Sequence, residues 1–276
     1  MSKNIIALLS DFGIDDPYSG IMKGVILSIN PAAKLVDISH RVPPGDIQRG
    51  AFVIWQASRD FPPGTIFLCV VDPGVGTERK GIILESKGQI FIGPDNGLFS
   101  YVTFNESYSV WELSNPELQL ENPANTFHGR DIFAPSAAYS TLGKNGSDFG
   151  KSIQKIAKLP SPAITIDNNK MIGEVISYDH FGNLFTSLGH FSFLDKTLSF
   201  SSWVSLSEIT IQKPSNLKIL VENRELPFVS TFGEIPFGSC AGLIGSTGLM
   251  EIVSNQDSAW SLLNLEIGSE IILDWS

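Results

Sequence analysis

Residues 65–76 read Thr-Ile-Phe-Leu-Cys-Val-Val-Asp-Pro-Gly-Val-Gly. The apolar first part predicts a buried β-strand, and the turn that follows places Asp72 directly after it. The run Ile5–Leu9 has the same organisation, because it ends at Ser10 and Asp11. In open α/β sheets, ligands bind beyond the carboxyl ends of the strands. The two runs therefore predict a sheet with polar, acidic side chains at its binding edge.

Short β-branched runs alternate with amphipathic stretches through the first half of the chain. Between Tyr18 and Ile29 the apolar positions recur at helical spacing, and Pro31 ends the run. This alternation is typical of a layered α/β domain with a largely parallel, Rossmann-like sheet. The further elements that we predict are a strand at 34–38, a helix at 46–58, a hairpin of 82–85 with 89–92, and a helix at 130–142.

The second half has a different rhythm. Its apolar runs are short, strand-like and separated by polar turns, which predicts a smaller all-β domain, barrel-like or a sandwich. These runs are 173–177, 198–204, 217–221, 241–244, 249–253 and 270–273. The stretch before them holds prolines and asparagines and few periodic apolar positions. We therefore predict an N-terminal α/β domain at 1–155, a linker at 156–170 and a C-terminal β domain at 171–276.

The composition favours a folded protein that does not bind polyanions. Of the 276 residues, 42% are hydrophobic, which is enough to form a buried core, and 17% are charged. The net charge of -10 disfavours nucleic acid and anionic membrane surfaces as partners. We expect no membrane span, which needs roughly 18 apolar residues in a row. Cys69 and Cys240 lie far apart in apolar runs, so we expect buried, reduced thiols and a cytoplasmic location.

Four polar clusters interrupt the apolar segments. The first is Ser10–Gly13 with Asp15 and Asp16, directly after the first strand. We expect Asp15 and Asp16 to cap the helix that follows, because carboxylates suit its positive end. Asp11 lies where a carboxylate can accept both hydroxyls of a ribose. The Asp-Phe-Gly triplet also occurs in protein kinases, but the other kinase motifs are missing here.

The second cluster runs from Asp72 to Arg79, and its glycines bend the chain so that the two end side chains can face one point. A loop salt bridge explains the segment equally well. The position of Arg79 breaks a dinucleotide-binding fingerprint, so a nicotinamide cofactor is not supported. The third cluster, 126–131, contains His128 and Asp131 at a predicted helix start, where capping is the simpler explanation. A metal held by Asp72, His128 and Asp131 lacks a specific spacing, and we expect a metal-free site.

The fourth cluster is divided between 177–185 and 245–256. A β-turn explains each piece taken alone. Small polar and aromatic groups are dense in both pieces, which fits a rim that holds an amino acid and a purine.

Taken together and in this order, the clusters resemble the SAM hydroxide adenosyltransferase family, relatives of the bacterial fluorinase and chlorinase. The resemblance extends over nearly the whole chain. The segments that carry it are Ser10–Gly13, Asp72–Gly76 with Arg79, Pro94–Gly97, Phe127–Asp131, Asp179–Asn183 and Gly245–Ser246.

This resemblance implies hydrolysis of S-adenosyl-L-methionine at C5′ to adenosine and L-methionine. It implies a homotrimer whose active sites lie between the N-domain of one subunit and the C-domain of its neighbour, and it implies no cofactor. Asp72, Arg79 and His128 match the residues that prepare water for attack. The implied substrate contacts are Asp11 for the ribose diol, Asp179 and Ser246 for the methionine end, Asn183 for adenine, and the aromatic residues Phe127, Phe181, Phe185 and Phe232.

Departures from the halogenases are informative. Halogenases have a tyrosine where this chain has Asp72, and the fluorinase has a serine in place of Gly129, which favours water over halide. Thr247 stands where the fluorinase has an arginine beside Ser246, so that contact to the methionine carboxylate is absent. The alternatives are a halogenase of the same fold that forms 5′-halo-adenosine, and a protein that binds S-adenosylmethionine or adenosine without turnover. The presence of Asp72, Arg79 and His128 argues against the second, because a binding pocket does not need a water-activating set.

Overall fold

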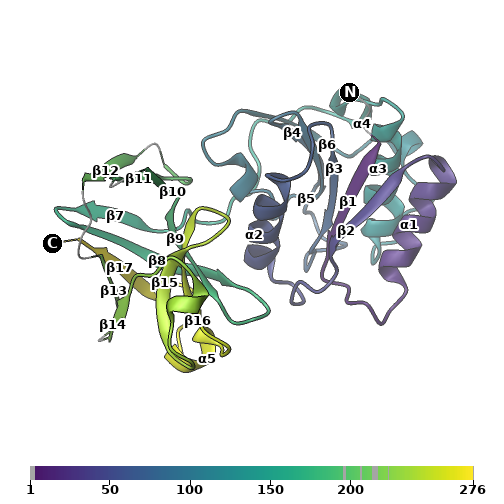
Figure 1. Ribbon diagram of the computed structural model, residues 1–276. Helices are drawn as coiled ribbons and strands as arrows, with labels where there is room; N and C mark the ends of the chain where they lie inside the picture. The colour runs from purple at the N-terminus through teal and green to yellow at the C-terminus, as the bar shows by residue number, and fades with distance from the viewer. Residues whose placement is uncertain (1–3, 195–196, 206, 213–216, 223, 276) are drawn as a thin grey trace. The chain divides into compact units, whose positions relative to one another are not determined.

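The computed structural model is a mixed α/β chain that divides into two compact units, Met1–Leu159 and Pro160–Ser276. It describes residues 4–194, 197–205, 207–212, 217–222 and 224–275. The first unit is coloured from purple to teal in Figure 1, and the second from green to yellow. Within the described part of the chain, no helix combines the length and the apolar character needed to cross a membrane.

A six-stranded sheet organises the first unit, in the order β2-β1-β3-β5-β4-β6. The neighbours from β2 to β5 are parallel, whereas β4 runs antiparallel to β5 and to β6. The first three strands confirm the predicted runs at 5–9, 34–38 and 65–71, and β6 was not predicted. The strands are β1 (Ile5–Ser10), β2 (Lys34–Ser39), β3 (Ile66–Val70), β4 (Gly81–Ser86), β5 (Gln89–Pro94) and β6 (Tyr108–Glu112).

Helices cover both faces of this sheet, with α1 and α3 on one face and α2 on the other (Figure 1). Met22 and Ile26 of α1 pack with Ile6, Leu8 and Leu68 of the strands in one buried cluster. The side chain of Asp46 caps α2, because it accepts the backbone N–H of Arg49 at 2.9 Å. The helices are α1 (Tyr18–Ile29), α2 (Ile47–Ser58), α3 (Ala134–Thr141) and α4 (Gly146–Phe149), with short turns η1 (Tyr101–Thr103), η2 (Pro116–Leu118) and η3 (Gly129–Phe133).

The predicted capping of α1 by Asp15 and Asp16 is wrong. Pro17 occupies the cap position of α1, and no side chain makes a cap hydrogen bond there. Both aspartates are exposed. The helix begins only at Tyr18, so the two carboxylates precede the cap and cannot reach the N–H groups of the first turn.

The predicted helix at 130–142 is two elements instead of one. Its first turn, η3, is a π-helix, and α3 follows it directly. Pro135 has no N–H to donate to the carbonyl of Asp131, four residues earlier. That carbonyl accepts the N–H of Leu120 at 2.9 Å instead. The missing helical hydrogen bond explains why the regular α-helix starts only at Ala134.

The second unit is built on an eight-stranded sheet in the order β14-β13-β17-β8-β9-β16-β15, with β7 paired to β8 outside this path. Its two ends meet, since Phe228 after β14 bridges Gly242 of β15 and the N–H of Val229 donates to the Gly242 carbonyl at 2.9 Å. The sheet is therefore nearly barrel-like. Its strands are β7 (Ile164–Asp167), β8 (Lys170–Tyr178), β9 (Leu184–Gly189), β13 (Lys218–Val221), β14 (Arg224–Pro227), β15 (Cys240–Ile244), β16 (Leu249–Ser254) and β17 (Glu270–Asp274).

Strand β7 lies inside the stretch 156–170 that the sequence predicted as a linker. Its residues pair antiparallel with β8, from Ile164 opposite Gly173 to Asp167 opposite Lys170. The two isoleucines of β7 pack partly buried against the core of the second unit. An alternating strand of four residues gives too short a pattern to stand out among prolines and asparagines.

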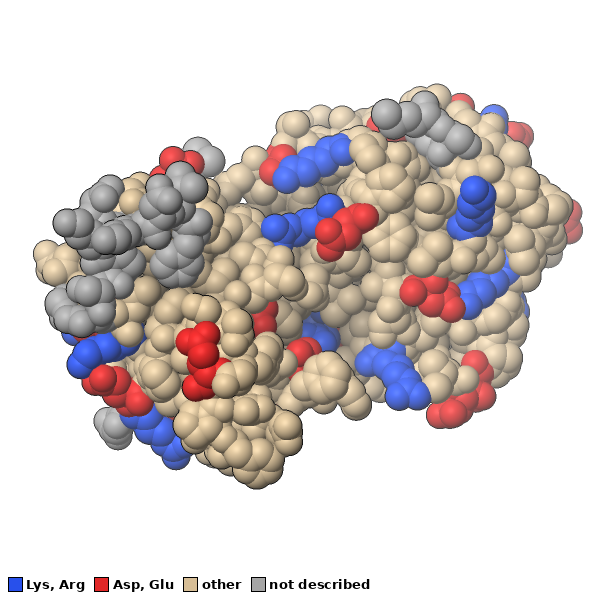
Figure 2. Space-filling view, in the orientation of Figure 1, with Lys and Arg blue, Asp and Glu red and all other residues tan. Residues whose placement is uncertain are grey.

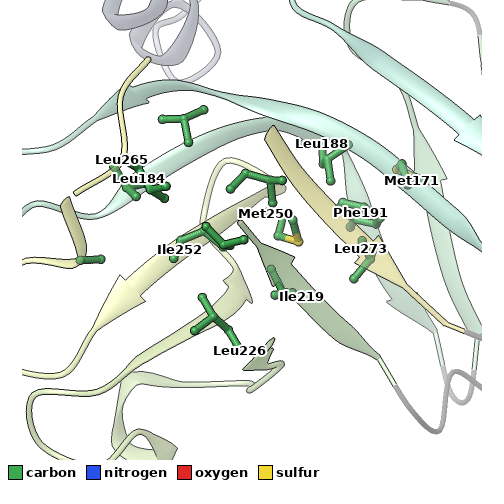
Figure 3. Packing of buried hydrophobic residues seen from close by; sticks show 14 of the residues in the cluster. Met171, Leu184, Leu188, Phe191, Ile219, Leu226, Met250, Ile252, Leu265 and Leu273 are labelled. Atoms are coloured by element: carbon green, nitrogen blue, oxygen red, sulfur yellow. The ribbon is translucent and has the colours of Figure 1, made fainter. Parts of the chain in front are cut away.

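The curled sheet encloses the core of the second unit. Met250 and Ile252 of β16 meet Ile219 of β13 and Leu273 of β17 inside it (Figure 3). A Cβ at Gly242 of β15 would meet the terminal methyl of Ile219, so a larger residue there would displace that side chain. A three-stranded sheet of β10 (Phe191–Leu194), β11 (Thr197–Ser201) and β12 (Glu208–Gln212), the helix α5 (Ala259–Leu263) and the turn η4 (Phe232–Glu234) complete the unit.

Candidate active site

The side chains of Asp72, Arg79 and His128 come together in the first unit. Arg79 Nε donates to Asp72 Oδ1 at 2.8 Å, and Arg79 Nη2 donates to Asp72 Oδ2. The same Nη2 lies 2.8 Å from Nδ1 of His128. The loop salt bridge that the sequence offered as one explanation is therefore present, and the distant histidine joins it.

Loop geometry brings these residues together. Asp72 follows the buried strand β3, and its carbonyl accepts the N–H of Val75 in a tight turn at 3.2 Å. Gly76 has a φ of 78° and lies so close to the Asn125 carbonyl that a Cβ would clash with it. The loop can thus pack against the segment that leads into His128, the residue before η3.

The cluster is mostly buried and its hydrogen-bond roles are defined. The side chains of Asp72 and Arg79 are 5% and 10% exposed. The guanidinium lies 5.3 Å from the ring centre of Phe133. Burial and the positive charge of Arg79 hold the pKa of His128 below its ordinary value. Because a guanidinium only donates, Nδ1 accepts, which assigns the proton of the neutral imidazole to Nε2.

Asp11 lies at the neighbouring strand end. Ser10 of β1 pairs with Val70 of β3, so Asp11 and Asp72 follow adjacent positions of the sheet. Asp11 Oδ2 accepts the N–H of Gly45 at 2.8 Å. Burial raises the pKa of Asp11, and the negative charge of Asp72 adds to this effect. Two carboxylates thus lie near each other at the edge where parallel sheets bind ligands.

A hydrogen-bond chain that the sequence analysis missed supports the loop after β1. Ser10 Oγ lies 2.7 Å from His40 Nδ1, and His40 Nε2 lies 3.1 Å from Asp37 Oδ1. Lys23 donates to the other oxygen of Asp37 at 2.6 Å. The only signal in the sequence was a pair of polar residues, Ser39 and His40, at the end of the second strand. The partner of His40, Ser10, is thirty positions earlier in the chain.

Phe127 packs in an aromatic group at the same end of the first unit. Its ring centre lies 5.9 Å from that of Phe12 and 5.4 Å from that of Tyr18, both edge-on. Gly129 is buried beside this group, and a Cβ there would lie 3.1 Å from the Met22 sulfur and 3.3 Å from Phe127. A larger residue at position 129 would therefore displace these neighbours.

In the second unit, Asp179 and Asn183 form the tight turn between β8 and β9. Asp179 Oδ1 accepts the N–H groups of Phe181 and Asn183, both at 2.9 Å, and Oδ2 accepts Nδ2 of Asn183 at 2.8 Å. An open pocket of about 420 Å³ adjoins this turn. It is lined by Phe181, Asn183, Phe232, Ser254, Gln256 and Asp257.

The remaining predicted substrate contacts are three phenylalanines and Ser246, all in the second unit. Phe181 is 74% exposed and Phe232 is 44% exposed, whereas Phe185 is only 6% exposed. Ser246 lies in the turn between β15 and β16, next to the buried Thr247. Phe185 lies in β9, whereas Phe181 and Ser246 lie in turns between strands and Phe232 lies in η4.

Among the described residues, Asp131 makes no hydrogen bond to the Asp72 cluster, although its negative charge acts on His128. Its carboxylate accepts Arg130 through both oxygens and the N–H of Ala124 at 2.8 Å. Among the described residues, no group of three or more His, Cys, Asp or Glu side chains is arranged to hold a metal ion. Acidic and basic side chains are interspersed on the face shown in Figure 2, which gathers no basic patch over its described part.

Comparisons with known proteins cover nearly the whole chain. Residues 6–150 match the model of the SAM hydroxide adenosyltransferase N-terminal domain, and residues 173–272 match that of the C-terminal domain. A protein of Thermus thermophilus named (R)-S-adenosyl-L-methionine hydrolase is 33% identical over 97% of this chain and 98% of its own. One of the same name from Methanocaldococcus jannaschii is 35% identical over 97% and 95%.

A fluorinase and a solved structure are also similar. The fluorinase of Nocardia brasiliensis is 29% identical over 97% of this chain and 95% of its own. The crystal structure of an uncharacterized conserved protein from Thermotoga maritima has a TM-score of 0.84 and 35% identity, and covers 98% of this chain and 99% of that one. Two named hydrolases thus share more identical residues with this chain than this fluorinase does.

The electrostatics of the cluster predict opposite effects of two charge-removing substitutions on the pKa of His128. Arg79→Gln removes a charge that lowers the pKa of His128, so this pKa should rise. Asp72→Asn removes a charge that raises it, so the pKa should fall. Histidine ring signals followed by NMR across a pH titration measure both. Shifts of the same sign in the two variants would show that the three groups do not interact as described.

Proposed function

The chain belongs to the SAM hydroxide adenosyltransferase family, and on that premise we propose that it hydrolyses S-adenosyl-L-methionine at C5′ to adenosine and L-methionine. The observation that carries this assignment is the hydrogen-bonded contact of Asp72, Arg79 and His128 at the binding edge of a parallel sheet. The enzyme needs no cofactor, because the sulfonium of the substrate already activates C5′.

The chemistry requires help for the nucleophile and none for the leaving group. The methionine sulfur leaves as a neutral thioether, so no acid is needed to protonate it. Water is a poor nucleophile, with a pKa of about 15.7. The protein must therefore hold one water in line with the C–S bond and receive its proton as the new bond forms.

Each residue of the cluster has a separate task in this mechanism. His128 presents Nε2–H, which donates to the water oxygen and orients it. Asp72 keeps about two of its four lone-pair positions after accepting Arg79, and these receive the proton. Arg79 carries a permanent positive charge that stabilises hydroxide character. Burial and the positive charge of Arg79 lower the pKa of His128, which favours the neutral imidazole that this role requires.

The substrate contacts follow the predicted set. Asp11 accepts the ribose hydroxyls, Asn183 contacts adenine, and Asp179 and Ser246 bind near the methionine end. Phe127, Phe181, Phe185 and Phe232 supply apolar walls. Attack neutralises the positive sulfur, so walls that solvate a sulfonium poorly raise the ground state more than the transition state.

We further propose a cytoplasmic homotrimer whose active sites each combine the first unit of one subunit with the second unit of a neighbour. The predicted ligands support this arrangement, because they are divided between the two units. Light scattering should give three times the mass of one chain. A fully active monomer would contradict the arrangement.

Substitution of the cluster tests the mechanism. Asp72→Ala, Arg79→Ala and His128→Ala should each lower the rate of adenosine formation by about 10²–10⁴-fold, the usual contribution of a proton-transfer or charge-stabilising group. Chromatography of products from purified protein measures this. Substitution of the exposed Asp15, which makes no contact with the cluster, serves as the control. Near-normal turnover by all three variants, or 5′-chloro-adenosine from the native protein in excess chloride, would refute the hydrolytic mechanism.

The sulfur configuration of the substrate is a further part of this proposal. The relatives are named for the (R) epimer at sulfur, and we expect this chain to prefer it too. A pyramidal sulfonium places its methyl group differently in each epimer, so one pocket cannot align both C–S bonds equally well. Competition between the two epimers should show faster consumption of the (R) form, and equal rates would contradict the preference.

A further inference from the structure

Glu251 of β16 is a buried carboxylate that has no partner within the part of the chain that the structure describes. The residue is 7% exposed, and no hydrogen bond or ion pair reaches its side chain among the described residues. Burial, together with the negative charge of Asp179, raises the pKa of Glu251 to about 7. Buried polar groups are nearly always paired, and an unpaired one is costly. Such a group calls for a ligand that supplies donors.

The carboxylate lies between the two segments that were predicted for the methionine end. On β16, Glu251 is opposite Phe185 of β9 and Leu243 of β15. Its Oε1 lies so close to Gly245 that a Cβ there would clash with it, which places the carboxylate at the start of the turn that carries Ser246. The negative charge of Asp179 also acts on Glu251 and raises its pKa.

Asp179 itself is occupied by its own turn. Its two oxygens accept three hydrogen bonds, from Phe181 and twice from Asn183. Within the described residues, no lysine or arginine is among the groups that shift the pKa of Glu251. With Thr247 beside Ser246 in place of an arginine, no cation of this segment competes for the carboxylate. Asp179 therefore uses most of its acceptor positions to shape the loop, whereas Glu251 keeps all of its own within the described residues.

We propose that Glu251 binds the α-ammonium group of the methionine moiety of the substrate, beside the contacts of Asp179 and Ser246, and that Asp179 also holds the β8–β9 turn. An ammonium carries three N–H donors and suits an unpaired carboxylate, whereas a sulfonium has none. Glu251 is thus a specificity residue for the amino-acid end. The inference rests on the proposed substrate. Its test measures binding, so a failure of the inference can be told apart from a failure of the proposed function.

The experiment compares two ligands that differ at the amino-acid end. S-adenosyl-L-methionine carries the ammonium, and 5′-dimethylsulfonio-5′-deoxyadenosine keeps a sulfonium at C5′ but lacks the whole amino-acid end. Glu251→Gln should weaken binding of S-adenosylmethionine about 10- to 100-fold, the value of a charged hydrogen bond. Binding of the analogue should be unchanged. The control is Glu270→Gln, which changes an exposed carboxylate on β17 and should alter the affinity for neither ligand.

Calorimetry in the His128→Ala background measures these affinities while turnover is slow, so the result does not depend on hydrolysis. Loss of affinity for both ligands alike, or for neither, would overturn the role of Glu251. Absence of hydrolysis by the native enzyme would instead refute the proposed function. The affinities would still decide whether Glu251 binds the ammonium group.

The pH dependence of stability verifies that Glu251→Gln is folded. A raised pKa means that Glu251 favours the native state below its ordinary pKa of 4.5, and that this contribution is lost as the pH rises through about 7. Without ligand, Glu251→Gln should therefore melt above the native protein at pH 8 and close to it at pH 5. A lower melting temperature at pH 8 would mean that the carboxylate has a structural partner, which would also overturn the proposal.

Discussion

One guanidinium holds the candidate active site together. Arg79 donates to both oxygens of Asp72 and also contacts Nδ1 of His128, so it fixes two side chains that come from different loops. Bidentate pairing leaves little rotational freedom to either partner. It also determines which nitrogen of the imidazole carries the proton. Without this contact, neither the orientation of His128 nor the free lone pairs of Asp72 would be defined.

The sheet makes that contact possible. Parallel strands β1 and β3 end side by side, which places Asp11 and Asp72 at one edge. Sequence reasoning predicted this, because buried strands give strong apolar runs and the residues after them are easy to locate. It also predicted the set of cluster residues through a family resemblance. The convergence of Arg79 with His128, 49 positions apart, is a long-range property that spacing alone does not encode.

Other features escaped the sequence for specific physical reasons. The aspartates before α1 matched a capping pattern, but Pro17 took the cap position. The π-turn before α3 depends on which partner the Asp131 carbonyl finds. Glu251 lies in an ordinary strand pattern, and only its burial without a hydrogen-bond partner among the described residues, close to Gly245, sets it apart. Each case depends on neighbours that are distant in the chain or absent from the pattern.

The origin of the new oxygen in adenosine tests the central claim most directly. A single turnover of S-adenosylmethionine in ¹⁸O-labelled water, followed by mass spectrometry, shows which atom attacked C5′. Activation of water by the Asp72, Arg79 and His128 cluster predicts one labelled oxygen at the 5′-hydroxyl, lost together with activity in Arg79→Ala. Unlabelled adenosine would mean that a different bond is cleaved, and would contradict the hydrolytic account.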